Sequence, residues 1–121
     1  MDIKWNTSVI NPQELIQVSR GDRHIIYKYL QQFQELIPQR IERLEESLKT
    51  MDRKKIRQLL HQMSPQLHFF GLKDIVQPIL LRLELDYATM PFEDLISLVN
   101  TVINKLILAI KDVEKVLKEN F

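Results

Sequence analysis

The spacing of apolar residues predicts a protein built from helices. Apolar positions recur at intervals of three and four over four long stretches, and few segments show the alternation of a strand. The clearest stretch lies between Asp52, a typical cap residue, and Gly71, which can supply the left-handed residue that ends a helix. Its apolar stripe is Ile56, Leu60, Met63, Leu67 and Phe70.

Cap and breaker residues mark the other helices. A short helix opens at Asn11-Pro12 and ends at Arg20-Gly21, because proline suits the first helical position and glycine the end. The expected helices span about residues 11–19, 22–49, 73–86 and 91–118. Pro38 is expected to bend the second helix or break it in two, and Pro78 lies inside the fourth.

These stripes predict an all-α fold. An antiparallel up-and-down four-helix bundle, with a short additional N-terminal helix, is the simplest way to bury four amphipathic helices joined by short loops. We expect one domain over residues 1–121, with the bundle at about 22–118. Residues 1–10, which include Trp5, are expected to be flexible or to pack against one end.

Composition agrees with one soluble domain. The chain has 121 residues, 45% of them hydrophobic, which suffices for one core. A formal net charge of +1 gives no general attraction to nucleic acid or to an anionic membrane, so neither is an expected partner. The N-terminus lacks an apolar signal region, and no apolar run approaches the roughly 20 residues that cross a bilayer. We therefore expect a cytoplasmic protein.

Several kinds of active site are excluded by residues that the chain lacks. Without cysteine there is no thiolate nucleophile, thiolate zinc site or disulfide. The two glycines, Gly21 and Gly71, are fifty residues apart, so glycine-rich loops that cradle nucleotide phosphates cannot form. No nucleophile-elbow sequence or His-Glu-x-x-His spacing occurs. We expect no metal site, no ATP site and no cofactor of the chain's own.

His61 is the candidate that remains. It lies roughly opposite the apolar stripe of its helix, so its imidazole should be exposed to solvent. An exposed histidine alone is more often a solvated surface residue than a nucleophile. Its context distinguishes it, because Gly71 follows it by ten residues.

With these positions, most of the chain resembles the histidine phosphotransfer (HPt) domain family. Members of that family carry an exposed, phosphorylatable histidine on a four-helix bundle, with a glycine ten residues after it. Here those residues are His61 and Gly71. The supporting positions that fall in the family's order are Gly21-Asp22, Phe33, Pro38, Leu44, Ser47-Leu48, Asp52 and Leu83-Glu84.

The resemblance implies a phosphoryl carrier without its own ATP site rather than an enzyme. His61 would accept a phosphoryl group from an aspartate of one receiver domain and pass it to another. The implied partners are receiver domains of response regulators or of hybrid histidine kinases, and the receiver would hold the magnesium ion.

Residues beside the histidine depart from the family pattern. The family usually has a lysine three positions after the histidine and a glycine four positions after it, where this chain has Ser64 and Pro65. The family also usually has a small residue just before the histidine, where this chain has Leu60. Arg57, one turn away, is the candidate to supply the missing charge, with Lys54 two turns away. The alternative is that Arg57 is simply part of a solvated face. Like glycine, Pro65 has little reach and should leave the histidine open to a partner.

Other residues near His61 have competing interpretations. His68 returns to the same helix face, where it would tune the site or be the rival acceptor, although the glycine spacing selects His61. Phe69 and Leu72 are candidate docking residues, the alternative being packing in the core. His24 is most simply a solvated residue.

Two alternative functions and one alternative assembly stay open. The chain would otherwise be a non-catalytic HPt-like module that docks on a receiver or kinase, which Ser64 and Pro65 favour, or an unrelated helical adaptor. We expect a monomer. A partner surface on the last helix, at Ile96, Ile103 and Ile107, is the alternative to burying those residues within one chain.

Overall fold

The computed structural model describes residues 2–121, and those residues contain five helices and no strand. The helices are α1 (Gln13–Ser19), α2 (Arg23–Lys49), α3 (Arg53–Phe69), α4 (Lys73–Asp86) and α5 (Phe92–Asn120). The predicted all-helical class is thus confirmed. The predicted helix boundaries agree with the observed ones to within about two residues.

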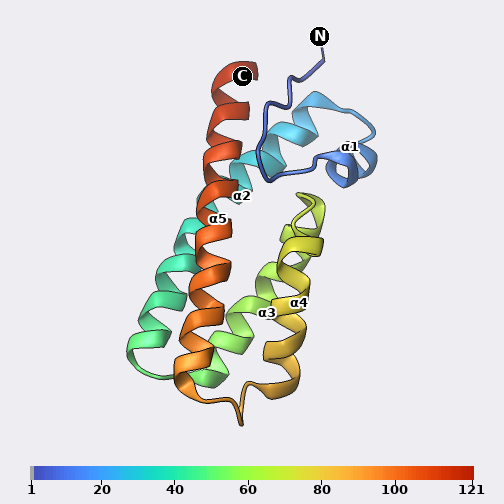
Figure 1. The fold of residues 1–121 in the computed structure, drawn as a ribbon. Coiled ribbons are helices and arrows are strands. Elements are labelled where there is room, and N and C mark those ends of the chain that lie inside the picture. The colour runs from blue at the N-terminus through green and yellow to red at the C-terminus, as the bar shows by residue number, and fades with distance from the viewer. Residues whose placement is uncertain (1) are drawn as a thin grey trace.

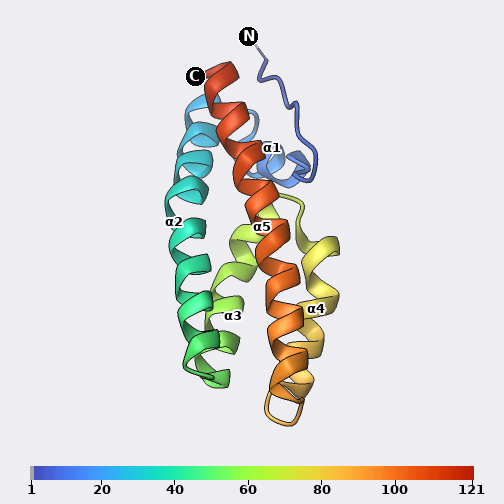
Figure 2. The same ribbon diagram turned by 60° about the vertical axis from the view of Figure 1, so that its left-hand side comes forward.

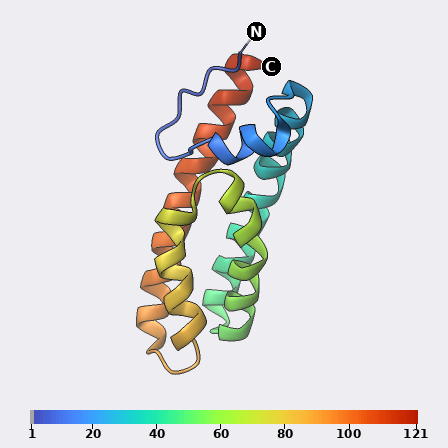
Figure 3. The ribbon, with the colours of Figure 1, turned by 90° about the vertical axis from the view of Figure 1, so that its right-hand side faces the viewer.

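Four of the helices run along the length of the molecule, and the fifth lies across one end (Figures 1 and 2). Helices α2 and α4 run one way and α3 and α5 the other, so each long helix is antiparallel to the next along the chain. Contacts join α2 to α3 and α5, and α4 to α3 and α5. Helix α1 contacts α2 and α3 beside the turn that ends α3, and α3 and α4 lie side by side (Figure 3).

Side chains and backbone satisfy the free groups at the helix ends. The Asp22 carboxylate accepts hydrogen bonds from the backbone N–H groups of the next turn, and Asp52 caps α3 in the same way. At the end of α3, Gly71 has φ 69° and donates to the carbonyl of His68, while Leu72 donates to that of Leu67. This pair of bonds is the Schellman motif, which requires a left-handed residue at Gly71.

Prolines lie inside three helices without ending them. Pro38, Pro65 and Pro78 are exposed, and α2, α3 and α4 each continue through their proline. Each proline leaves one carbonyl of the preceding turn without its helical partner, and water can satisfy that carbonyl on an exposed face. The expectation that Pro38 could break the second helix in two is therefore wrong, because its position on the solvent face lowers the cost.

The predicted apolar stripes form the core. All five stripe residues between Asp52 and Gly71 are buried. Apolar residues of α2 at helical spacing are also buried, except half-buried Leu48: Ile26, Leu30, Phe33, Ile37, Ile41 and Leu44. On α5, Ile103 is buried within the chain, Ile96 is half-buried and Ile107 is 40% exposed, so the possible partner surface there is reduced. None of the helices within residues 2–121 has the length and apolar character needed to cross a membrane.

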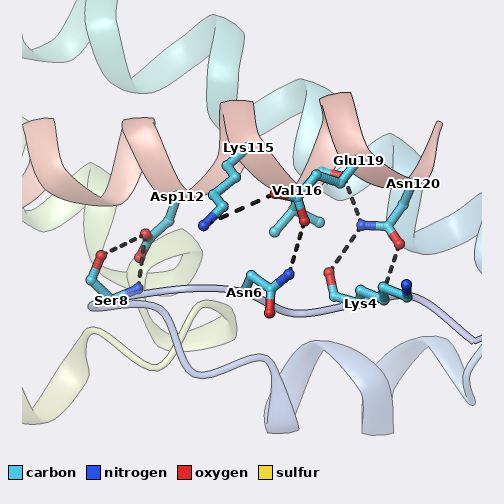
Figure 4. Close-up of polar contacts among 8 residues, drawn as sticks. All are labelled: Lys4, Asn6, Ser8, Asp112, Lys115, Val116, Glu119 and Asn120. Atoms are coloured by element: carbon cyan, nitrogen blue, oxygen red, sulfur yellow. Dashed lines mark hydrogen bonds and ion pairs between the residues drawn. The ribbon is translucent and has the colours of Figure 1, made fainter.

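The segment before α1 lies along α5 and is hydrogen-bonded to it (Figures 1 and 4). Asp112 of α5, only 4% exposed, accepts from the backbone N–H groups of Ser8, Val9 and Ile10 and from the Ser8 hydroxyl, at 2.8–3.1 Å. Burial alone would raise the pKa of Asp112, but these four donors outweigh it and hold the pKa below its usual 3.8. Trp5 of the same segment is half-buried against the core.

The same segment then reaches the turn that ends α3. The backbone N–H of Asn11 donates to the carbonyl of Phe70 at 3.1 Å, which brings Asn11 against Gly71. A Cβ at Gly71 would lie 2.5 Å from the Cβ of Asn11 and 2.6 Å from its carbonyl oxygen. The N-terminal segment therefore fits only because residue 71 has no side chain.

Candidate functional site

His61 occupies the solvent side of α3, as its position in the sequence predicts. Its side chain is 63% exposed, while Leu60 and Met63 on the same turn are buried. Helix α3, which carries His61, is capped at both ends, by Asp52 at its start and by the Gly71 turn at its end. The imidazole is thus both accessible and mounted on a well-supported backbone.

A carboxylate from the neighbouring helix contacts the imidazole. The Oε1 atom of Glu84, on α4, lies 3.2 Å from Nε2 of His61. The same oxygen accepts a hydrogen bond from the guanidinium of Arg57 at 2.7 Å. The Arg57 guanidinium also stacks over the ring of Tyr87, at 5.0 Å from its centroid. Arg57, Glu84 and His61 therefore form one connected polar cluster.

This cluster borders a groove of about 530 Å³ between α3 and α4. Half of its lining residues are apolar, and these form most of its surface: Leu60, Pro65, Leu67, Val76, Leu80, Leu81 and Leu83. The polar residues are Arg57, His61, Ser64, His68, Lys73, Gln77 and Glu84. Of the seven apolar residues on α4, only Val76 and Leu83 are fully buried, so this helix leaves much of its apolar surface accessible.

The structure brings most of the predicted site residues to this groove. Ser64, Pro65 and His68 line it together with His61, whereas Lys54 is exposed on α3 outside it. Arg57 lines it too, but its charge is already paired with Glu84. Arg57 is therefore near the imidazole as expected, yet it is not a free cation.

His68 has a different environment from His61. Its Nε2 lies 3.8 Å from a carboxylate oxygen of Glu14 on α1, and its ring is next to that of Phe69, with centroids 5.9 Å apart. Its side chain is 44% exposed, against 63% for His61. Two histidines thus share one groove, but each faces a carboxylate from a different helix.

The two candidate docking residues do not lie in the groove. Leu72 is fully buried, and in the Schellman turn its backbone N–H donates to the carbonyl of Leu67, so its interpretation as a docking residue is wrong. Phe69 is half-buried and packs edge-on against Tyr29, with ring centroids 5.5 Å apart. Both residues therefore pack within the protein, which was the alternative interpretation.

Sequence reasoning did not identify Glu84 as a site residue. Glu84 belongs to the pattern that resembles the family, but nothing in its spacing connects it to His61 on another helix. Other residues of α4 also line the groove without any sequence signal that connects them to His61: Lys73, Gln77, Leu80 and Leu81. Over residues 2–121, no three His, Asp or Glu side chains are grouped so as to hold a metal ion.

Comparisons with known proteins assign no family to this chain. No family model, curated protein or solved structure matches it.

Proposed function

We propose that this protein is a histidine-containing phosphotransfer protein of a two-component phosphorelay. The observation that carries the proposal is the exposed imidazole of His61 on a well-capped helix, beside an accessible groove. The left-handed Gly71, ten residues on, adds support from the resemblance. We propose that the four long helices form an antiparallel up-and-down bundle with α1 across one end. The proposal places the protein in the cytoplasm, as a monomer.

The chemistry requires little from this chain. A neutral imidazole nitrogen attacks the phosphorus of an aspartyl phosphate on a receiver domain, and the aspartate carboxylate leaves with the electrons of the P–O bond. A second receiver later takes the phosphoryl group from the histidine. Phosphoryl transfer depends mainly on positioning and charge stabilisation, which the receiver and its magnesium ion would supply. The carrier contributes an accessible nucleophile on a rigid support.

Mixing the protein with a panel of phosphorylated receivers and magnesium tests this function. We expect an acid-labile, alkali-stable phosphate on the wild-type chain, because phosphohistidine has that stability. His61→Gln should take no label, and His68→Gln, which removes the second histidine of the same groove, should take it normally. Circular dichroism of both variants checks that they are folded. If no receiver labels the wild type, the relay function is wrong, and the reverse pattern would make His68 the acceptor.

The second candidate is a non-catalytic module that docks on a receiver or kinase. One observation favours it: Arg57, the basic residue one turn from His61, is paired with Glu84, and Ser64 carries no charge. In that case a receiver would bind the protein without labelling His61. Binding of an unphosphorylated receiver, measured together with the labelling assay, separates the two functions.

Restoring a cation beside the histidine should increase transfer. Ser64 lines the groove one turn after His61, where the family usually has a lysine. We expect Ser64→Lys to raise the rate of phosphoryl uptake by about 1.4-fold to five-fold, because one exposed charge pair contributes about 0.2–1 kcal/mol. Ser64→Gln, which has similar reach and no charge, is the control. Equal rates for the two variants would show that charge at this position does not matter.

A further inference from the structure

The groove between α3 and α4 has the size and the lining of a small-molecule site. Its volume of about 530 Å³ lies within the roughly 300–1,000 Å³ that such sites usually occupy. Its apolar lining residues within positions 2–121 are all leucine, valine or proline, so a flat aromatic ligand would find no apolar ring to stack on. Along α4 the lining extends from Lys73 to Glu84, which is about 16 Å at the rise of a helix. The groove is therefore long enough for an extended aliphatic chain.

The charged side chains differ between the two ends of this groove. Where α3 begins and α4 ends, the Arg57 guanidinium and the Glu84 carboxylate lie 2.7 Å apart and offset each other's charge. Where α3 ends and α4 begins, Lys73 is exposed and forms no ion pair within residues 2–121. The neighbouring Asp74 does not line the groove. One end of the groove therefore carries a positive charge that no lining carboxylate offsets.

From this arrangement we infer that the groove binds a fatty-acid anion, with its carboxylate at Lys73 and its chain along the apolar side chains toward Glu84. The carboxylate complements the unpaired ammonium group, and the chain displaces water from apolar surface. That surface includes Leu81, which is 56% exposed, and the half-buried Leu80. Binding of this ligand does not depend on the proposed function.

A ligand in the groove would also affect His61. The imidazole and the apolar side chains line the same groove, so a bound chain lies beside the histidine. It therefore occupies space that a receiver needs in order to reach the imidazole. Inhibition of phosphoryl uptake by the fatty-acid anion follows, and this consequence rests on the proposed function.

Titration of nitrogen-15-labelled protein with dodecanoate, below the concentration at which it forms micelles, tests the site. NMR shifts should saturate and should concentrate on the backbone amides of α3 and α4. Shorter acids should bind more weakly, by about two- to four-fold for each methylene removed. Dodecyltrimethylammonium has a similar chain and a cationic head. It should bind about two- to thirty-fold more weakly, because a repulsion replaces an attraction of similar size. Equal binding of the two amphiphiles, or no saturable binding of dodecanoate, would overturn the inference.

Matched variants test whether the groove is the place of binding. Leu81→Gln should weaken dodecanoate binding about five- to ten-fold, because part of a leucine side chain loses its apolar contact. Leu85→Gln changes a leucine of the same helix that is 75% exposed and does not line the groove, so it should bind like wild type. Lys73→Gln should weaken binding by about 1.4-fold to five-fold. Lys55→Gln, an exposed change on α3 outside the groove, is its control. Equal effects within either pair would contradict the assignment.

Two results would assign the groove to another occupant and overturn the inference. In the first, the ligand-free protein sediments as a dimer that Leu81→Gln separates, which would make the groove an interface between two copies of the chain. In the second, dodecanoate does not bind, whereas an unphosphorylated receiver binds wild type and not Leu81→Gln. We expect a ligand-free monomer and saturable binding of dodecanoate.

The labelling assay measures the effect on His61. Dodecanoate at a saturating concentration should slow phosphoryl uptake by wild type, and the same concentration should slow Leu81→Gln less, because that variant binds the ligand more weakly. Unchanged uptake by wild type with the ligand bound would disprove the inhibition and leave the binding site intact. If wild type takes no label without ligand, the relay function fails, and the titrations alone decide whether the groove binds a fatty-acid anion.

Discussion

Replacing Gly71 by alanine is expected to lower the free energy of unfolding by about 3–5 kcal/mol. Two costs add at this position. The backbone has φ 69°, which an L-residue with a Cβ adopts only with strain, and the new Cβ would lie 2.6 Å from the carbonyl oxygen of Asn11. Because the contact with Asn11 is to a backbone atom, rotation of a side chain cannot relieve it. The N-terminal segment or the Gly71 turn must move.

The other glycine provides a matched control. Gly21 has nearly the same backbone conformation, φ 72°, but a Cβ there would meet nothing within 4 Å. Gly21→Ala should therefore show the conformational cost alone, about 1 kcal/mol. Urea denaturation followed by circular dichroism measures both variants. Equal losses would mean that the close approach of Asn11 contributes nothing to the cost at Gly71.

Replacing Asp112 by alanine is expected to lower the free energy of unfolding by about 2–4 kcal/mol. The carboxylate accepts four hydrogen bonds, three of them from consecutive backbone N–H groups of residues 8–10. One of these donors belongs to Ile10, which is buried and is poorly placed to bond water instead. The variant should also release the segment from α5, which limited proteolysis within residues 2–10 would detect.

The contribution of Asp112 should depend on pH. The pKa of Asp112 in the folded protein is below the usual 3.8. The ionised carboxylate therefore stabilises the folded protein above pH 3.8, and this stabilisation is lost as the pH falls through the pKa of the folded state. The difference in unfolding free energy between wild type and Asp112→Asn should therefore shrink in acid. Glu114→Ala, an exposed change two residues on, should stay within about 0.5 kcal/mol of wild type. A difference independent of pH would contradict the role of the carboxylate charge.

Local signals in the sequence predicted the helices and the exposure of His61. Cap residues such as Asp22 and Asp52 act on backbone groups within one turn, and the period of the apolar stripes follows from helix geometry alone. The same geometry places His61 opposite its stripe without reference to any other helix. Pro38 shows the limit of such signals, because its effect depended on which face of the helix it occupied.

Contacts between distant residues were decided only by the tertiary structure. Glu84 reaches His61 because α4 packs beside α3 in one particular register, and a shift of that register by one residue would point its carboxylate elsewhere. Likewise, Asp112 and Asn11 acquire their roles only when the N-terminal segment lies along α5 and against Gly71. The sequence alone thus determined the helices and the exposed histidine, since both depend on neighbours within a few turns. The groove, the carboxylate on the imidazole and the close approach at Gly71 required the packed helices, because each joins side chains or backbone from separate segments.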